Sequence, residues 1–93
     1  MQEQEYPHPD FKIFVSSVSL QATICLGLVE SPVTGKKERN MKQAQFLIDT
    51  LDMIREKTKG NLLKDEEEFL EDAIANLKLN YSKIIQEEGR DDK

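Results

Sequence analysis

Hydrophobic residues recur along the chain in three stretches, and the clearest repeat lies between residues 40 and 58. Its apolar positions are three or four residues apart, which places their side chains on one face of a helix. This stripe consists of Met41, Ala44, Leu47, Ile48, Leu51 and Ile54. Asn40 is suited to cap the start of such a helix, and Gly60 is suited to the left-handed turn that ends it. We therefore predict a helix over residues 40–58 that buries this stripe.

Phe46 and Met53 lie outside the stripe. They are seven residues apart, so both project from a second face of the same helix. Packing against a single neighbour would leave an aromatic ring and a methionine in water. Phe46 and Met53 are therefore our candidates for a contact with another protein chain.

The most apolar stretch, residues 11–28, also fits a helix. Its β-branched residues favour a strand, but it is longer than an ordinary strand, and its polar residues interrupt it too often for a membrane-spanning helix. The predicted core face carries Phe14, Val18, Ala22 and Cys25, with Phe11, Val15 and Leu26 alongside. A second face carries the small residues Ser16, Ser19 and Thr23. Asp10 is in position to cap the start, and Gly27 marks the end.

A third helix is predicted over residues 65–86. Asp65 and Glu68 have the spacing of a capping box, and acidic side chains favour the start of a helix. Its apolar positions are Leu70, Ala73, Ile74, Leu77, Tyr81, Ile84 and Ile85. Asn80 lies near this stripe, where a polar side chain either fixes the register of a helical assembly or reaches solvent.

These patterns predict an all-α domain of three helices, at about 11–28, 40–58 and 65–86. Residues 1–10, which contain Pro7 and Pro9, form a flexible lead-in, residues 11–86 form the single domain, and residues 87–93 form a frayed tail. A chain of 93 residues with 38% hydrophobic residues has enough apolar surface for one core and little to spare. We expect self-association to complete a helical bundle.

The charge balance narrows the range of partners. Thirteen basic and 18 acidic side chains give a net charge of -5, which disfavours nucleic acid and anionic membrane surfaces. The single cysteine, Cys25, cannot form an intramolecular disulfide, and the lead-in lacks the basic start of a secretory signal. We expect a cytoplasmic protein.

Candidate chemistry is sparse. Gly35-Lys36 lacks the earlier glycine and the following hydroxyl residue of a phosphate-binding loop. His8 has no second histidine or cysteine with which to share a metal ion, and the acids of the third helix lack the spacing of a calcium loop. Cys25 lies late in an apolar helix, where no base is expected to activate it. We therefore expect no catalytic residue, no metal site, no cofactor and no enzyme activity.

Two loops offer a different kind of site. Lys57, Thr58 and Asn61 present an ammonium, a hydroxyl and an amide between two helices, and they also fit a helix stop. The basic residues from Lys36 to Arg39 precede a helix start, where free amides bind anions, and they also fit a solubilising loop.

Short motifs along the chain form a recognisable series. They are Leu26-Gly27-Leu28, Pro32, Gly35, Ala44, Ile48-Asp49 with Leu51, Lys57-Thr58 and Gly60-Asn61-Leu62. The series covers residues 11–82 and resembles the bacterial family of short proteins known as domain of unknown function 1844. That resemblance implies a small, helical, cytoplasmic protein with no assigned activity, and it transfers no catalytic residue. The chain departs from the family at Lys64-Asp65, where members often have a hydroxyl residue and proline.

Our hypothesis for the function is a non-enzymatic helical module that self-associates, as a dimer, and binds protein through Phe46 and Met53. The alternative hypothesis is a regulatory protein that binds a small ligand or an anion at its inter-helix loops.

Overall fold

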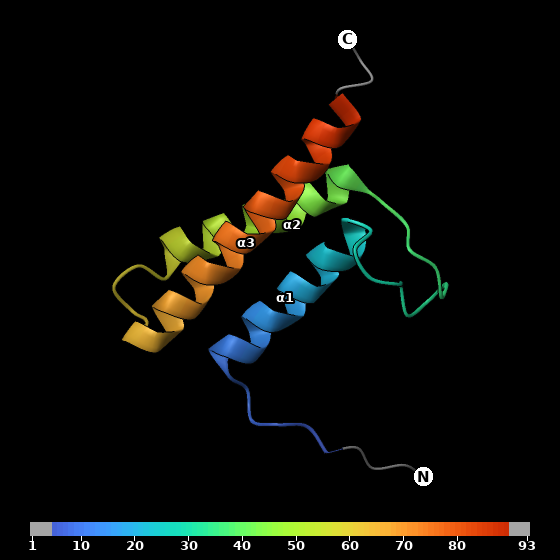
Figure 1. Ribbon diagram of the computed structural model, residues 1–93. Coiled ribbons are helices and arrows are strands. Elements are labelled where there is room, and N and C mark those ends of the chain that lie inside the picture. The colour runs from blue at the N-terminus through green and yellow to red at the C-terminus, as the bar shows by residue number, and fades with distance from the viewer. Residues whose placement is uncertain (1–4, 90–93) are drawn as a thin grey trace.

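The computed structural model describes residues 5–89, and this part of the chain contains three α-helices and no strand. α1 spans Phe11–Cys25, α2 spans Met41–Lys57 and α3 spans Lys64–Gly89. α1 and α3 lie side by side and α2 crosses behind α3 (Figure 1), and each helix packs against the other two. The predicted all-α, three-helix domain is confirmed. In the predicted lead-in, residues 5–10 have no regular secondary structure, whereas residues 1–4 and 90–93 lie outside the described part.

One apolar core lies between the three helices. Its buried residues are Val15, Ala22 and Leu26, then Ala44, Leu47, Ile48 and Leu51 of α2, and Leu70, Ile74, Leu77 and Ile84 of α3. Met41 and Ile54 are partly buried against this cluster. The stripe predicted on α2 is therefore confirmed, because its six residues are the ones that α2 contributes to the core.

α1 ends at Cys25, three residues earlier than predicted. The backbone φ of Gly27 is 78°, a left-handed conformation that glycine adopts without strain. The N–H of Gly27 donates to the carbonyl of Ile24 at 2.9 Å, and the N–H of Leu28 donates to the carbonyl of Thr23 at 3.2 Å. This pair of bonds is a Schellman motif, in which the glycine follows the C-cap residue. The stop signal was identified correctly, but the predicted boundary at residue 28 was wrong.

The start of α1 and its core face also differ from the prediction. The carboxylate of Asp10 makes no capping hydrogen bond; only its carbonyl accepts the N–H of Phe14, at 3.0 Å. Phe14 was wrongly placed on the core face and is 45% exposed, with its ring 6.3 Å from that of Phe11. Val15 and Ala22 define the buried side, and Phe14 projects to one edge of it.

Both ends of α2 carry the predicted signals. The side chain of Asn40 accepts the N–H of Gln43 at 3.1 Å, which satisfies one free amide of the first turn. At the other end the N–H of Thr58 donates to the carbonyl of Ile54 at 2.9 Å. Gly60 follows with a φ of 84°, as expected for a left-handed stop.

α3 starts with a different cap from the one predicted. The carboxylate of Glu66 accepts the N–H of Leu63 at 2.9 Å, which is half of a capping box centred two residues before Asp65. The carboxylate of Asp65 instead pairs with the ammonium of Lys12 on α1 at 2.7 Å. The prediction of a cap at Asp65 was wrong because this side chain has a partner in a distant part of the sequence.

α3 continues to Gly89, three residues beyond the predicted end, so the start of the predicted frayed tail is helical. Arg39 holds this last turn, because its guanidinium donates to Glu88 at 3.1 Å and to the carbonyl of Leu26 at 3.0 Å. The loop of residues 26–40 is thereby fixed to the ends of both α1 and α3. Ile85 was predicted on the apolar stripe but is exposed.

Candidate protein-contact surfaces

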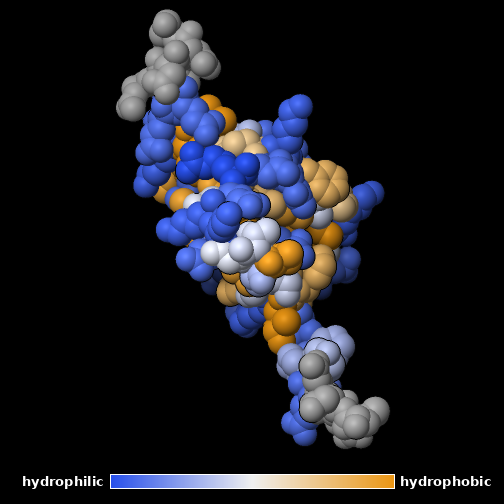
Figure 2. All heavy atoms as spheres, turned by 90° about the vertical axis from the view of Figure 1, so that its right-hand side faces the viewer, coloured by the Kyte–Doolittle hydropathy of each residue, from blue (hydrophilic) through white to orange (hydrophobic). Residues whose placement is uncertain are grey.

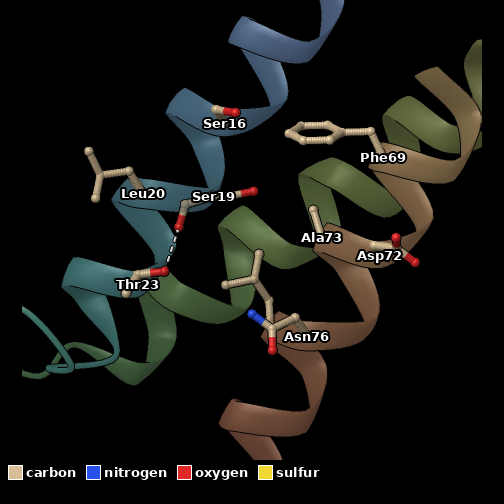
Figure 3. A pocket seen from close by; sticks show the side chains of 9 residues that line it. Ser16, Ser19, Leu20, Thr23, Phe69, Asp72, Ala73 and Asn76 are labelled. Carbon is tan, nitrogen blue, oxygen red and sulfur yellow. Dashed lines mark hydrogen bonds between the residues drawn. The ribbon is translucent and has the colours of Figure 1, made fainter. Parts of the chain in front are cut away.

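A groove of about 570 Å³ runs between α1 and α3, on the side away from α2 (Figure 3). Its lining consists of Ser16, Ser19, Leu20 and Thr23 from α1 and of Phe69, Asp72, Ala73, Asn76 and Leu77 from α3. In Figure 3 the ring of Phe69 extends across the groove toward α1, whereas Leu20 points away from α3. The groove therefore continues outward onto the exposed side of α1.

Short side chains explain why this space is open. Ser16, Ser19 and Thr23 form the small-residue face predicted for the first helix, and Ala73 faces them from α3. Interior packing is normally dense, so small residues on both walls leave room that a larger side chain would fill. The sequence indicated the α1 wall. The α3 wall was missed, although the spacing of Phe69, Ala73 and Asn76 by four and three residues is a helical repeat.

The polar atoms of the groove are incompletely paired. The hydroxyl oxygen of Ser19 is buried and makes no hydrogen bond with the described residues. Leaving a buried hydroxyl unpaired costs about 1–3 kcal/mol. The hydroxyl of Thr23 donates to the backbone carbonyl of Ser19 at 2.8 Å. Within residues 5–89, the side chains of Asp72 and Asn76 bond to no other residue.

The outer side of α1 is apolar and uncovered. Ile13 is 42% exposed and Leu20 is 56% exposed. Helical spacing places Ser17 and Ile24 on the same side. Lys12 is the one charged side chain of α1, and it is paired with Asp65. α1 is the most apolar of the three helices, and apolar side chains favour burial, yet the fold leaves Ile13 and Leu20 about half exposed.

The outer face of α2 carries the two predicted contact residues. Phe46 is 66% exposed and Met53 is 47% exposed. Lys42, Thr50 and Lys57 lie near them by helical spacing. Two exposed apolar side chains one above the other, within a polar frame, form a small patch suited to a protein contact.

The loop side of the molecule shows a different pattern. In Figure 2 hydrophobic side chains appear there as separate orange and tan clusters among blue hydrophilic ones. Val33, in the loop of residues 26–40, is 90% exposed. Isolated exposed apolar side chains are common on protein surfaces, so this face defines no site of its own.

The predicted loop site between α2 and α3 is largely occupied by capping bonds. The hydroxyl of Thr58 donates to the carbonyls of Ile54 at 2.7 Å and Arg55 at 3.4 Å, and the N–H of Asn61 donates to the carbonyl of Thr58 at 2.8 Å. Lys57 is exposed beside them. These contacts are the ones that a helix stop requires.

The basic loop from Lys36 to Arg39 also has hydrogen-bond partners within the protein at its C-terminal end. The guanidinium of Arg39 donates to the carbonyl of Leu26 and to the carboxylate of Glu88. The side chain of Asn40 accepts the N–H of Gln43. The guanidinium and one first-turn amide of α2 therefore already have partners. Lys36 is exposed on the same loop.

Groups suited to chemistry are few in the described part of the chain. No cluster of three His, Cys, Asp or Glu side chains within residues 5–89 is placed to hold a metal ion. Burial raises the pKa of the Cys25 thiol above its usual value, which favours the less nucleophilic protonated form. His8 is exposed in the lead-in. None of the described helices combines the length and hydropathy needed to cross a lipid bilayer.

The fold and its surfaces define a small three-helix domain with uncovered apolar side chains on α1 and α2 and an open groove between α1 and α3. The chain belongs to the family described as domain of unknown function (DUF1844), whose sequence signature matches residues 8–83. The resemblance of the short motifs to this family is thus confirmed. No curated protein and no solved structure matches the chain.

Proposed function

We propose that the protein is a non-enzymatic helical module for protein association, and that it self-associates as a dimer. The observation that carries this proposal is the incomplete burial of α1, whose outer residues Ile13 and Leu20 are exposed although this helix is the most apolar of the three. Phe46 and Met53 provide a second contact surface on α2.

The exposed apolar side chains set the strength of the association. Full burial of a large apolar side chain contributes about 1.5–3 kcal/mol, so a half-exposed one has about 1 kcal/mol left to gain. Ile13, Phe14 and Leu20, with Phe69 at the groove, then supply about 4 kcal/mol per chain and about 8 kcal/mol per symmetric dimer. Association itself costs about 4–15 kcal/mol, which leaves a surplus of about 4 kcal/mol at the lower end of that cost. The expected dimer is therefore weak, with a dissociation constant of about 1 mM.

Light scattering coupled to size exclusion tests the proposal, with the full chain loaded from about 10 µM to several mM, a range that spans the expected dissociation constant. We expect the mass to rise from one chain toward two. The double variant Phe46→Asp, Met53→Asp tests the second surface by affinity capture from an extract of the native cell, and we expect it to recover less partner protein.

A matched control for the double variant is Ser82→Asp with Gln86→Asp, which adds the same two charges to exposed polar positions on α3. We expect this control to behave like the unmodified chain. A chain that stays monomeric at every concentration, with capture unchanged in the Phe46→Asp, Met53→Asp variant, would refute the proposed function.

A further inference from the structure

We infer that the outer side of α1 and the adjoining groove, together called the α1–α3 face, bind the same face of a second copy of this chain, with the two α1 helices antiparallel. This inference rests on the proposed function, because it names the surface and the geometry of the proposed self-association.

The outer side of α1 has the residue spacing of a helix-pairing seam. Ile13, Ser17, Leu20 and Ile24 are separated by four, three and four residues, which is the heptad alternation that keeps side chains facing a partner helix. Ile13, Ser17 and Leu20 are exposed. Ile24 is half-buried and lies outside the core cluster.

The seam can pack against the seam of a second copy that runs in the opposite direction. When two α1 helices run antiparallel about a point between Val18 and Ser19, Ile13 meets the second copy's Ile24, and Ser17 meets the second copy's Leu20. Each large leucine then lies against a small serine. A parallel pair would instead place leucine on leucine and serine on serine, which crowds one position and leaves a gap at the other.

Self-complementarity is what a twofold symmetric dimer requires of its contact patch. A foreign partner needs no such property, so the pattern favours a second copy as the occupant. The charge distribution also favours a second copy as the occupant. Lys12 is the one charged side chain of α1, and it is paired with Asp65. The antiparallel seam therefore brings no like charges together, and the opposed helix dipoles attract each other.

The α1–α3 face is large enough for a small dimer interface only if the groove is included in that interface. α1 has 15 residues and is about 22 Å long, and a helix with its side chains is about 10 Å wide. α1 alone offers a footprint of roughly 220 Å², whereas α1 and an equal length of α3 beside it offer roughly 450 Å² before the roughness of the side chains is counted. A standard interface buries about 800 Å² of accessible surface on each partner. The second copy must therefore cover the groove, where the Ser19 hydroxyl is buried without a partner.

Sedimentation equilibrium of the full chain tests the location of the contact. Leu20→Asp places a charge in the seam twice per dimer, and we expect it to weaken the dimer by about 30-fold or more. The matched control is Phe46→Asp, which introduces the same charge at an exposed apolar position on α2. The control should change the dissociation constant by less than about threefold. Circular dichroism spectra that match the unmodified chain show that both variants are folded.

Disulfide trapping tests the antiparallel register. In a Cys25→Ser background, one chain carries Ser17→Cys and another carries Leu20→Cys, both at exposed positions. Oxidation of an equimolar mixture should give mainly the mixed disulfide, and either variant alone should give little. A parallel arrangement would give disulfides within each variant alone, and it would overturn the register.

The outcomes separate this inference from the function on which it rests. A dimer that persists unchanged in Leu20→Asp removes the α1–α3 face as the contact and leaves self-association standing. A chain that is monomeric throughout the concentration range removes both.

Discussion

Substitution of Gly27 by alanine tests how the end of α1 is held. The φ of Gly27 is 78°, and a left-handed conformation costs a residue with a Cβ about 1–2 kcal/mol. The new Cβ would lie 3.3 Å from Nε and 3.4 Å from Cβ of Arg39. Arg39 would have to shift, and its bonds to the Leu26 carbonyl and to Glu88 would weaken. With about 1 kcal/mol for a disturbed hydrogen bond, the expected loss in the free energy of unfolding is about 2–3 kcal/mol.

The chain offers controls that separate backbone strain from crowding. Gly35 and Gly60 have φ values of 72° and 84°, and a Cβ at either position would meet no atom within 4 Å. Gly35→Ala and Gly60→Ala should therefore lose only the strain, about 1–2 kcal/mol. Urea unfolding followed by far-UV circular dichroism measures all three variants at one protein concentration, which also keeps any association constant.

A double-mutant cycle isolates the role of Arg39. In an Arg39→Ala background, Gly27→Ala should cost about 1 kcal/mol less than in the unmodified chain, because the guanidinium that the new Cβ displaces and its hydrogen bonds are already absent. The reasoning is refuted if Gly27→Ala costs no more than Gly35→Ala, or if the two substitutions in the cycle prove additive.

Three further predictions concern the core, a cap and an ion pair. Leu51→Ala should lower the free energy of unfolding by about 3 kcal/mol because this side chain is fully buried in the core; a loss below about 1 kcal/mol in urea unfolding would contradict that. Asn40→Ala should cost about 1 kcal/mol by removing the N-cap, and hydrogen exchange should show faster exchange at the amide of Gln43, with an unchanged rate counting against the cap. The hydrogen bond from Lys12 lowers the pKa of Asp65 below its usual value of 3.8, so this pair adds stability above that pH and loses it as the pH falls through the lowered pKa. Thermal unfolding of Asp65→Asn should therefore show a smaller drop in Tm on acidification below about pH 4 than the unmodified chain, and identical drops would disprove the contribution.

Features that depend on neighbouring residues could be predicted from the sequence. The cap at Asn40, the left-handed stop at Gly60 and the stripe of α2 are local patterns, and all three are present. The cap of α3 could not be predicted in this way. Asp65 has the composition and spacing of a capping residue, but it pairs with Lys12, 53 positions away, and only the packing of α1 against α3 brings the two together.

The candidate contact surfaces differ in the same way, because one could be predicted from neighbouring residues and the other could not. Phe46 and Met53 stand out because the stripe of α2 leaves them on another face, and their exposure follows from that periodicity. In α1 apolar residues occur on several sides of the helix, so periodicity gives no single direction, and Phe14 was assigned to the wrong side. The groove needed the structure, since its walls come from two helices whose alignment is set by the core they share.

The partial burial of α1 also predicts which helix detaches first when the domain unfolds locally. α1 faces α3 across short side chains and an open groove, and Ile13 and Leu20 on its outer side are about half exposed. Its detachment would uncover Val15, Ala22 and Leu26, while α2 and α3 keep their own contact. Proteins unfold locally in cooperative units, and a unit that buries fewer residues opens at lower free energy. Within the described chain α1 has two buried residues, Val15 and Ala22, whereas α2 and α3 have four each. The backbone amides of α1 should therefore exchange with deuterium before those that α2 and α3 bury between them, so that the least stable unit of the domain is its most apolar helix.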